Sequence, residues 1–254
     1  MDTVRILNLD IHNHRFQDFL QSLESGVVFT PNVDHLMKLQ KDRAFYEVYQ
    51  KADHIVCDSR IIQISSRWLP QEPIQEQIAG SDFFPAFCQY HGQRRDDFRV
   101  FLLGGTPDSV KQAAANINAK AGSEIIVGAY SPPFGFEFEP AANEYIVKQI
   151  KASAANVLAV GVGAPKQEKW IMAHRYELPQ IKLFFAIGAT IDFQAGLVQR
   201  SPQWISKIGL EWLHRIFQEP GRMLKRYFVD DLPYFYLLWK QKRGRYRNPW
   251  RSSS

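Results

Sequence analysis

The sequence has little of what several protein classes require. It contains only two cysteines, Cys57 and Cys88, and their spacing is not that of metal ligands, so we expect buried or free thiols rather than a disulfide framework. No apolar run approaches the roughly 20 residues that a membrane-spanning helix needs. The first residues lack the basic-then-apolar order of a signal peptide. We therefore expect a cytosolic protein.

Two nucleotide-site motifs are also missing. No Asp-x-Asp triad occurs, although many nucleotide-sugar transferases use one to hold Mg²⁺ or Mn²⁺ on a diphosphate. We therefore expect no metal and no other cofactor. No glycine turn completes Gly-x-Gly-x-x-Gly with an acidic residue about 20 positions further on, which disfavours a nicotinamide-dependent dehydrogenase. Such a Rossmann dehydrogenase remains an alternative function.

Positive charge is concentrated at the C-terminal end. The 254 residues carry a formal net charge of +5, but residues 200–254 alone contain 12 Lys and Arg against 4 Asp and Glu. Nucleic acid, an anionic membrane or an anionic substrate could each explain this basic region. The length and the hydrophobic content of 45% suit one large α/β domain with an appendage.

Strand-like and helix-like segments alternate up to about residue 193. Strands are expected at 4–11, 26–32, 54–57, 99–103, 125–129, 157–162 and 183–187, and helices at 16–23, 33–51, 61–68, 81–90, 107–120, 141–152 and 167–175. This alternation predicts a Rossmann-like parallel sheet flanked by helices, although it does not give the order of the strands. We expect an α/β body over 1–195, a basic helical appendage over 196–242 with helices at 204–216 and 222–236, and a disordered tail over 243–254.

Three of the predicted strands end in turns of small residues. Gly104 and Gly105 follow the strand at 99–103, and Gly161 and Gly163 lead through Pro165 into the helix at 167–175. The strand at 183–187 ends at Gly188 and Ala189. Such turns let a ligand approach the backbone, and the N–H groups of a first helical turn favour anions. The carboxyl ends of parallel strands meet at one edge of the sheet, where ligands bind. An ordinary tight strand–helix turn explains a single Gly-x-Gly equally well.

Eight motifs in register identify a family resemblance over roughly residues 5 to 230. They are Thr30-Pro31-Asn32, Asp58 at a strand end, Ala79 to Asp82, Leu103 to Gly105, Pro132 to Gly135, Gly161 to Glu168, Gly188 to Phe193, and Arg200 to Tyr227. With these motifs the chain resembles the WecG/TagA/CpsF glycosyltransferase family. The resemblance implies inverting transfer of a sugar from a UDP-sugar to a polyprenyl-diphosphate-linked sugar, for wall polymers, common antigen, capsule or exopolysaccharide.

The resemblance also assigns roles in the chemistry. Inverting transfer needs a base for the acceptor hydroxyl and stabilisation of the leaving diphosphate. Asp58 matches the family's base, although it could instead cap the helix that begins at Ser59 or Arg60. Thr30 matches an active-site position, with a strand-end cap as the alternative. Gln167 could donate to the diphosphate from the start of its helix, or could merely be polar there.

Further positions are expected to bind the donor and the diphosphate. Donor-binding residues are expected at Asn32, Gly104, Gly105, Gly161, Gly163, Pro165 and Asp192. Asp192 could accept the uracil N3–H, with a turn or cap role as the alternative. Glu168 and Lys169 fit a solvated helical face. The family often carries an arginine three residues before Gly80, where this chain has Gln77, and it commonly has glycine after the aspartate, where this chain has Ser59. Arg60 is a candidate substitute for the missing arginine, and diphosphate or acceptor binding is also expected at Arg215, Arg222 and Lys225.

The basic C-terminal region suggests where the protein acts. Its aromatic residues interleave with Lys and Arg, as in segments that lie on anionic membranes. We therefore expect a peripheral protein on the inner face of the cytoplasmic membrane. A nucleic-acid-binding module would explain the basic aromatic segment but not the polar residues at the strand ends, so we expect no nucleic acid. The donor sugar is not determined, and a homo-oligomer is possible.

Overall fold

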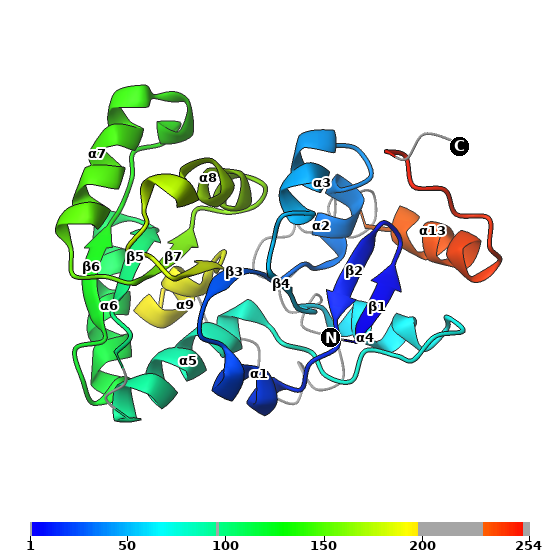
Figure 1. Cartoon of the computed structure of the whole chain (residues 1–254), viewed down its shortest axis with the longest axis horizontal. Coiled ribbons are helices and arrows are strands. Elements are labelled where there is room, and N and C mark those ends of the chain that lie inside the picture. The colour runs from blue at the N-terminus through cyan, green and yellow to red at the C-terminus, as the bar shows by residue number, and fades with distance from the viewer. Residues whose placement is uncertain (1, 95–96, 198–230, 251–254) are drawn as a thin grey trace.

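The computed structural model describes residues 2–94, 97–197 and 231–250. In these ranges a six-stranded, all-parallel sheet with the order β4-β3-β8-β7-β5-β6 forms the centre of the molecule (Figure 1). Its strands are β3 Gly26–Phe29, β4 His54–Ile55, β5 Val100–Gly104, β6 Ile126–Tyr130, β7 Val157–Gly161 and β8 Leu183–Ala186. The predicted Rossmann-like α/β architecture is thereby confirmed.

Helices cover both faces of this sheet. One face carries α2 Val33–Lys38, α3 Arg43–Tyr49, α7 Pro140–Ala152 and α8 Lys166–His174, and the other carries α1 Phe16–Ser22, α5 Gly80–Arg94, α6 Pro107–Ala121 and α9 Thr190–Ala195. Along β5, Phe101 and Leu103 pack on the first face, whereas Val100 and Leu102 pack on the second. Because both faces are buried, the central strands are almost wholly apolar, as is usual in parallel sheets.

The helices that follow the neighbouring strands β5 and β7 pack on opposite faces of the sheet. The connection from β5 runs through α6 to β6, and the connection from β7 runs through α8 in the other direction to β8. Right-handed crossovers in opposite directions place the two helices on opposite sides of the sheet. Ligands of open α/β sheets bind outside the carboxyl ends of such strand pairs. The topology therefore predicts a ligand site at the turns after β5 and β7.

The N-terminal segment and the first long helix both differ from the prediction. Residues 4–11, predicted as one strand, form an antiparallel hairpin of β1 Thr3–Ile6 and β2 Leu9–His12. The turn residue Asn8 is buried and donates its Nδ2 to the carbonyl of Leu39 at 3.0 Å, which stabilises the reversal. The helix predicted at 33–51 is divided into α2 and α3, because the Asp42 side chain accepts from the Phe45 amide and starts a new helix.

The C-terminal segment packs on the body. Helix α13, Pro233–Lys242, lies beside the β1–β2 hairpin in Figure 1, and Gln241 accepts from the Leu7 amide at 2.7 Å and donates to the Arg5 carbonyl at 2.7 Å. Beyond it, Trp250 donates its indole N–H to the Leu39 carbonyl at 2.7 Å. Disorder was expected from residue 243 onwards, and residues 243–250 do not follow that expectation, because Tyr246, Asn248 and Trp250 hydrogen-bond to the body. The helix predicted at 204–216 lies outside the described residues, and of 222–236 only 231–236 is described.

Candidate active site

Two of the predicted catalytic residues lie together at the carboxyl edge of the sheet. Thr30 directly follows β3, and Asp58 lies three residues beyond β4. Gly80, the first residue of α5, donates its amide to Asp58 Oδ1 at 3.0 Å. A Cβ added to Gly80 would lie 2.8 Å from Thr30 Oγ1, so there is no room for a side chain there. Thr30 and Asp58 therefore both lie next to Gly80 at the start of α5.

Asp58 does not cap the helix that begins at Arg60, which was the alternative that the sequence suggested for it. Ser59, rather than Asp58, caps α4, Arg60–Ser66, by accepting from the Ile62 amide at 3.4 Å. The Asp58 carboxylate instead accepts from the first residue of α5. This hydrogen bond fixes its position and leaves a carboxylate at a strand end, where a base for a bound substrate is needed.

Gln77, which stands where the family often has arginine, and the candidate substitute Arg60 both lie close to Asp58 in the chain or in space. Gln77 donates its Nε2 to the Asp58 carbonyl at 2.7 Å. Arg60 donates from Nη1 to the side chain of Gln63, while its buried Nε has no hydrogen-bond partner. A guanidinium with an unused buried donor is suited to an anion. The geometry therefore keeps Arg60 as a candidate for the role of the missing arginine.

Five glycines lie at the carboxyl ends of β5, β7 and β8, and they divide into two groups according to what surrounds them. They are Gly104, Gly105, Gly161, Gly163 and Gly188. A side chain at Gly104 would overlap the Gly161 carbonyl oxygen, and one at Gly105 would overlap Ser109 Oγ. A Cβ on Gly161 would lie 2.7 Å from the Gly188 carbonyl oxygen. These three glycines are required by the close approach of neighbouring turns. At Gly163 and Gly188, by contrast, an added Cβ would meet nothing within 4 Å, so among these five glycines these two border open space.

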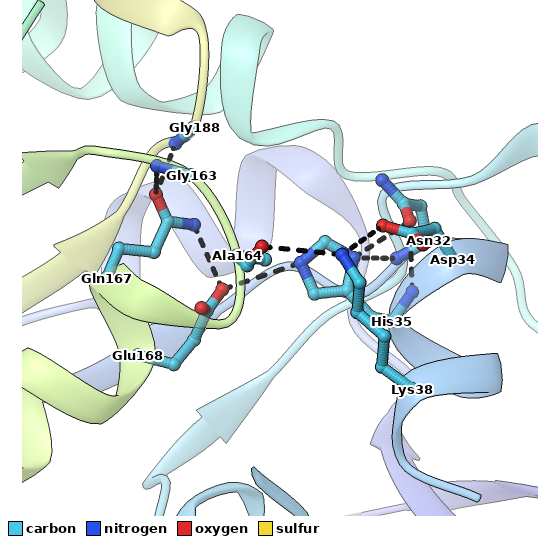
Figure 2. A network of polar contacts seen from close by, with 9 residues as sticks. All are labelled: Asn32, Asp34, His35, Lys38, Gly163, Ala164, Gln167, Glu168 and Gly188. Atoms are coloured by element: carbon cyan, nitrogen blue, oxygen red, sulfur yellow. Dashed lines mark hydrogen bonds and ion pairs between the residues drawn. The ribbon is translucent and has the colours of Figure 1, made fainter. Parts of the chain in front are cut away.

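Gln167 connects these two open turns instead of facing solvent. It lies in the first turn of α8 and is buried. Its Oε1 accepts from the amides of Gly188 at 3.0 Å and Gly163 at 3.3 Å (Figure 2). Its Nε2, the group expected to donate to a diphosphate, donates to Glu168 Oε1 at 2.9 Å. Gln167 therefore fixes the turn after β7 to the turn after β8.

A buried acid–imidazole pair next to Gln167 was not predicted. Glu168, expected on a solvated face, has an exposed fraction of 1% and lies 3.4 Å through Oε1 from His35 Nε2. Nδ1 of His35 in turn contacts Asn32 Oδ1 at 2.8 Å. The signal was present in the helical spacing, because Glu168 precedes the buried Ile171 by three positions and shares its face. Lys169 pairs with Asp42 at 2.6 Å and is about a third exposed.

Negative charge surrounds a buried tyrosine at this edge. Burial raises the pKa of the Tyr49 hydroxyl well above its ordinary value, and the charges of Glu168, Asp58 and Asp34 raise it further. The buried Tyr49 oxygen has no hydrogen-bond partner. Lys38 offsets part of this charge by pairing with Asp34 at 2.7 Å, and it also reaches the Ala164 carbonyl (Figure 2).

The remaining predicted residues either lie near the open turns in sequence or lie outside the described residues. Pro165 directly precedes α8, and Asp192 lies partly buried in the first turn of α9, so both are near the open turns in sequence. Arg215, Arg222 and Lys225 lie outside the described residues. A shallow surface hollow lined by Arg99, Asn156 and others lies at the amino edge of the sheet, because these residues precede β5 and β7. It is therefore remote from the site.

The described part of the chain holds neither a cluster of metal-ligating side chains nor a helix that could cross a membrane. Within 2–94, 97–197 and 231–250, no three His, Cys, Asp or Glu side chains are grouped as metal ligands. In the same ranges no helix has the length and apolarity to cross a membrane.

A comparison with protein families gives the same assignment as the sequence motifs. The family model described as the glycosyl transferase WecG/TagA/CpsF family matches residues 4–248. The match spans nearly the whole chain, so the protein belongs to this family of glycosyltransferases.

Proposed function

From membership of this family as the premise, we propose that the protein is an inverting hexosyltransferase. It moves a sugar from a UDP-sugar to a polyprenyl-diphosphate-linked sugar acceptor in the synthesis of a cell-surface polysaccharide or wall polymer. The observation that carries the proposal is the meeting of Thr30 and Asp58 around Gly80 at the carboxyl edge of the sheet. Both residues follow strands, so the scaffold holds them rigidly near the turns where an α/β sheet binds nucleotides.

Asp58 is assigned as the general base of this reaction. The acceptor hydroxyl oxygen attacks the anomeric carbon, the bond from that carbon to the diphosphate breaks, and the hydroxyl proton passes to the carboxylate. The Gly80 amide holds the Asp58 carboxylate in place. Thr30 lies next to the same amide and orients either the base or the sugar through its hydroxyl.

In this reaction protein groups, rather than a metal, stabilise the negative charge on the leaving UDP. The open turns at Gly163 and Gly188 leave room beside them for the diphosphate, while their amides donate to Gln167. Arg60 supplies a guanidinium with an unused donor. Arg215, Arg222 and Lys225 add cations from the C-terminal region. Bidentate guanidinium groups match diphosphate oxygens better than ammonium groups do.

The acceptor lipid places the protein at an anionic membrane surface, on the inner face of the cytoplasmic membrane. Support comes from α13, where Phe235, Tyr236 and Trp239 have exposed fractions of 40%, 57% and 45%. Lys240 lies over the Tyr236 ring at 4.5 Å, and Arg243 lies over the Trp239 ring at 5.8 Å. Aromatic rings combined with cations favour the interface of an anionic bilayer, where each cation contributes about 1 kcal/mol.

A donor screen tests the chemistry. Purified protein, extracted polyprenyl-diphosphate acceptors and EDTA are combined with a panel of UDP-sugars, and the release of UDP is measured. We expect turnover with one sugar and a loss of at least about 100-fold in Asp58→Asn. Asp53→Asn is the matched control, because Asp53 precedes the same strand and its carboxylate accepts from the Val27 amide at the opposite edge. It should retain turnover within about threefold.

Each result has a separate meaning. Unchanged turnover in Asp58→Asn would exclude this carboxylate as the base. No UDP release from any donor would contradict the proposed function. Arg60→Ala should lose far more activity than the exposed Arg67→Ala, and equal losses would exclude Arg60 as the substitute for the missing arginine. UDP should raise the melting temperature, whereas NAD and single-stranded DNA should not, which separates the transferase from a dehydrogenase and from a nucleic-acid-binding module.

A further inference from the structure

A continuous set of polar contacts crosses the sheet edge from β3 to the two open turns (Figure 2). Asn32 Oδ1 contacts His35 Nδ1 at 2.8 Å, and His35 Nε2 lies 3.4 Å from Glu168 Oε1. Glu168 Oε1 accepts from Gln167, whose own Oε1 accepts from the amides of the Gly163 and Gly188 turns. Asn32 lies only two residues beyond Thr30. The contacts therefore connect the strand end that carries a catalytic residue with the turns that border open space.

Hydrogen-bonding rules fix where one proton of His35 lies. The backbone amide of His35 donates to Asn32 Oδ1 at 3.3 Å, so this atom is the amide oxygen and can only accept. The 2.8 Å contact then requires His35 Nδ1 to carry a hydrogen. The Asn32 amide also approaches Nδ1, at 3.4 Å, and would need Nδ1 to accept. The 2.8 Å contact is the shorter of the two and favours a hydrogen on Nδ1.

An attractive contact between the imidazole and the carboxyl group requires a second proton. With Nδ1 protonated, a bare Nε2 and an ionised Glu168 would be two acceptors facing each other at 3.4 Å. The contact becomes attractive only when His35 is an imidazolium or when Glu168 is a carboxylic acid. In either form the pair is neutral as a unit and holds one shared proton.

Burial argues that this pair is not retained for stability. The side chains of Glu168 and His35 have exposed fractions of 1% and 11%. Glu168 Oε2 is buried without a hydrogen-bond partner, and so is the hydroxyl of Tyr49. Buried pairs with unsatisfied atoms contribute little to stability, and apolar residues often replace them without loss. A positioning role explains why such a group stands between α2 and α8.

We propose that His35 and Glu168 are positioning residues that act through one shared proton. The pair orients Gln167, which in turn holds the Gly163 and Gly188 turns in a fixed position relative to the strand end of Thr30. This inference rests on the proposed function, in which those turns receive the diphosphate of the UDP-sugar. Loss of His35 removes the contact that supports Glu168, and loss of Glu168 removes the acceptor of Gln167 Nε2. We expect Gln167 then to hold the two turns less firmly, so that the donor binds to a less ordered site.

A double-mutant cycle tests this coupling. His35→Gln, Glu168→Gln and the double variant are compared by UDP calorimetry and by hydrogen exchange of the Gly163 and Gly188 amides. We expect each single variant to bind UDP about tenfold more weakly and to exchange both amides at least about tenfold faster. The double variant should match the singles, because all three break the same connection. Lys169→Gln is the control, since its pair with Asp42 also joins α8 to α3 but leads away from the turns.

The possible outcomes separate the inference from the proposed function. Multiplicative losses in the double variant, or equal losses in Lys169→Gln, would overturn the coupling. Unchanged amide exchange would overturn it as well, whatever UDP does. If the wild-type protein does not bind UDP, the proposed function fails, and the exchange measurement still decides the coupling. Should the variants not fold, ¹⁵N spectroscopy of wild-type His35 decides, because an unprotonated Nδ1 at neutral pH contradicts the shared proton.

Discussion

Replacing Gly104 by alanine should destabilise the fold far more than replacing Gly163 by alanine. Both glycines lie at the carboxyl ends of strands, and both were predicted to bind the donor. Gly104 has a φ of 140°, and a side chain there would overlap the Gly161 carbonyl oxygen. Strained backbone costs about 1–3 kcal/mol, and overpacking costs about 1–3 kcal/mol more. The sum is about 4 kcal/mol. Gly163 has a φ of 85° but open space around it, so the left-handed conformation alone costs about 1–2 kcal/mol there.

Thermal and urea unfolding measure this difference. For a chain of this size a loss of 1 kcal/mol lowers the melting temperature by about 2–4 °C, so Gly104→Ala should lose at least about 8 °C and Gly163→Ala at most half of that. Urea midpoints should follow the same order at an unchanged m-value. Gly163→Ala should in addition weaken UDP binding, because its methyl group enters the open space. Equal destabilisation by the two variants would refute the assignment of Gly104 to packing and of Gly163 to the ligand.

Three further predictions concern other parts of the structure. Burial raises the pKa of the Cys57 thiol to about 12 and that of Cys88 higher still, so a thiol reagent at neutral pH should modify neither cysteine until the protein is denatured. Burial, and then charge repulsion within their histidine cluster, lowers the pKa of His12 and His14, so the unfolded state binds more protons below about pH 6.5 and stability falls there. His14→Gln should therefore reduce the fall of the urea midpoint between about pH 7.5 and about pH 5. Gln241→Ala removes both hydrogen bonds from α13 to the N-terminal hairpin, and a fall in unfolding free energy of about 1–3 kcal/mol should appear in urea titration.

The sequence predicted the layers of the fold because periodicity is a local property. Apolar runs ending in glycine indicated parallel strands, and the structure has them at those positions. The order of the strands was beyond prediction, since it depends on which strands pair across the chain. The hairpin turn at Asn8 and the helix break at Asp42 were missed because each depends on one polar side chain satisfying particular backbone groups.

The candidate site was predicted unevenly for a related reason. Thr30 and Asp58 could be brought together from sequence, because the carboxyl ends of parallel strands must share one edge of the sheet. The role of Gly188 could not be derived in this way, because it depends on a contact between turns after different strands. The burial of Glu168 was missed although its helical spacing from the buried Ile171 indicated it. The family resemblance did not supply these contacts either, since a motif identifies residue types and not their partners.

The partners of Gln167 restrict how a diphosphate can be bound. The amides of Gly163 and Gly188 already donate to Gln167 Oε1, so a phosphate oxygen at the same amides would have to displace it. Displacement would also break the contact of Gln167 with the buried Glu168, which has no second hydrogen bond at Oε2 to compensate. A donor that leaves Gln167 in place avoids this cost and must draw its counter-charge from side chains. Arg60 is such a side chain among the described residues at the carboxyl edge of the sheet. Residues 200–254 contain twelve further Lys and Arg.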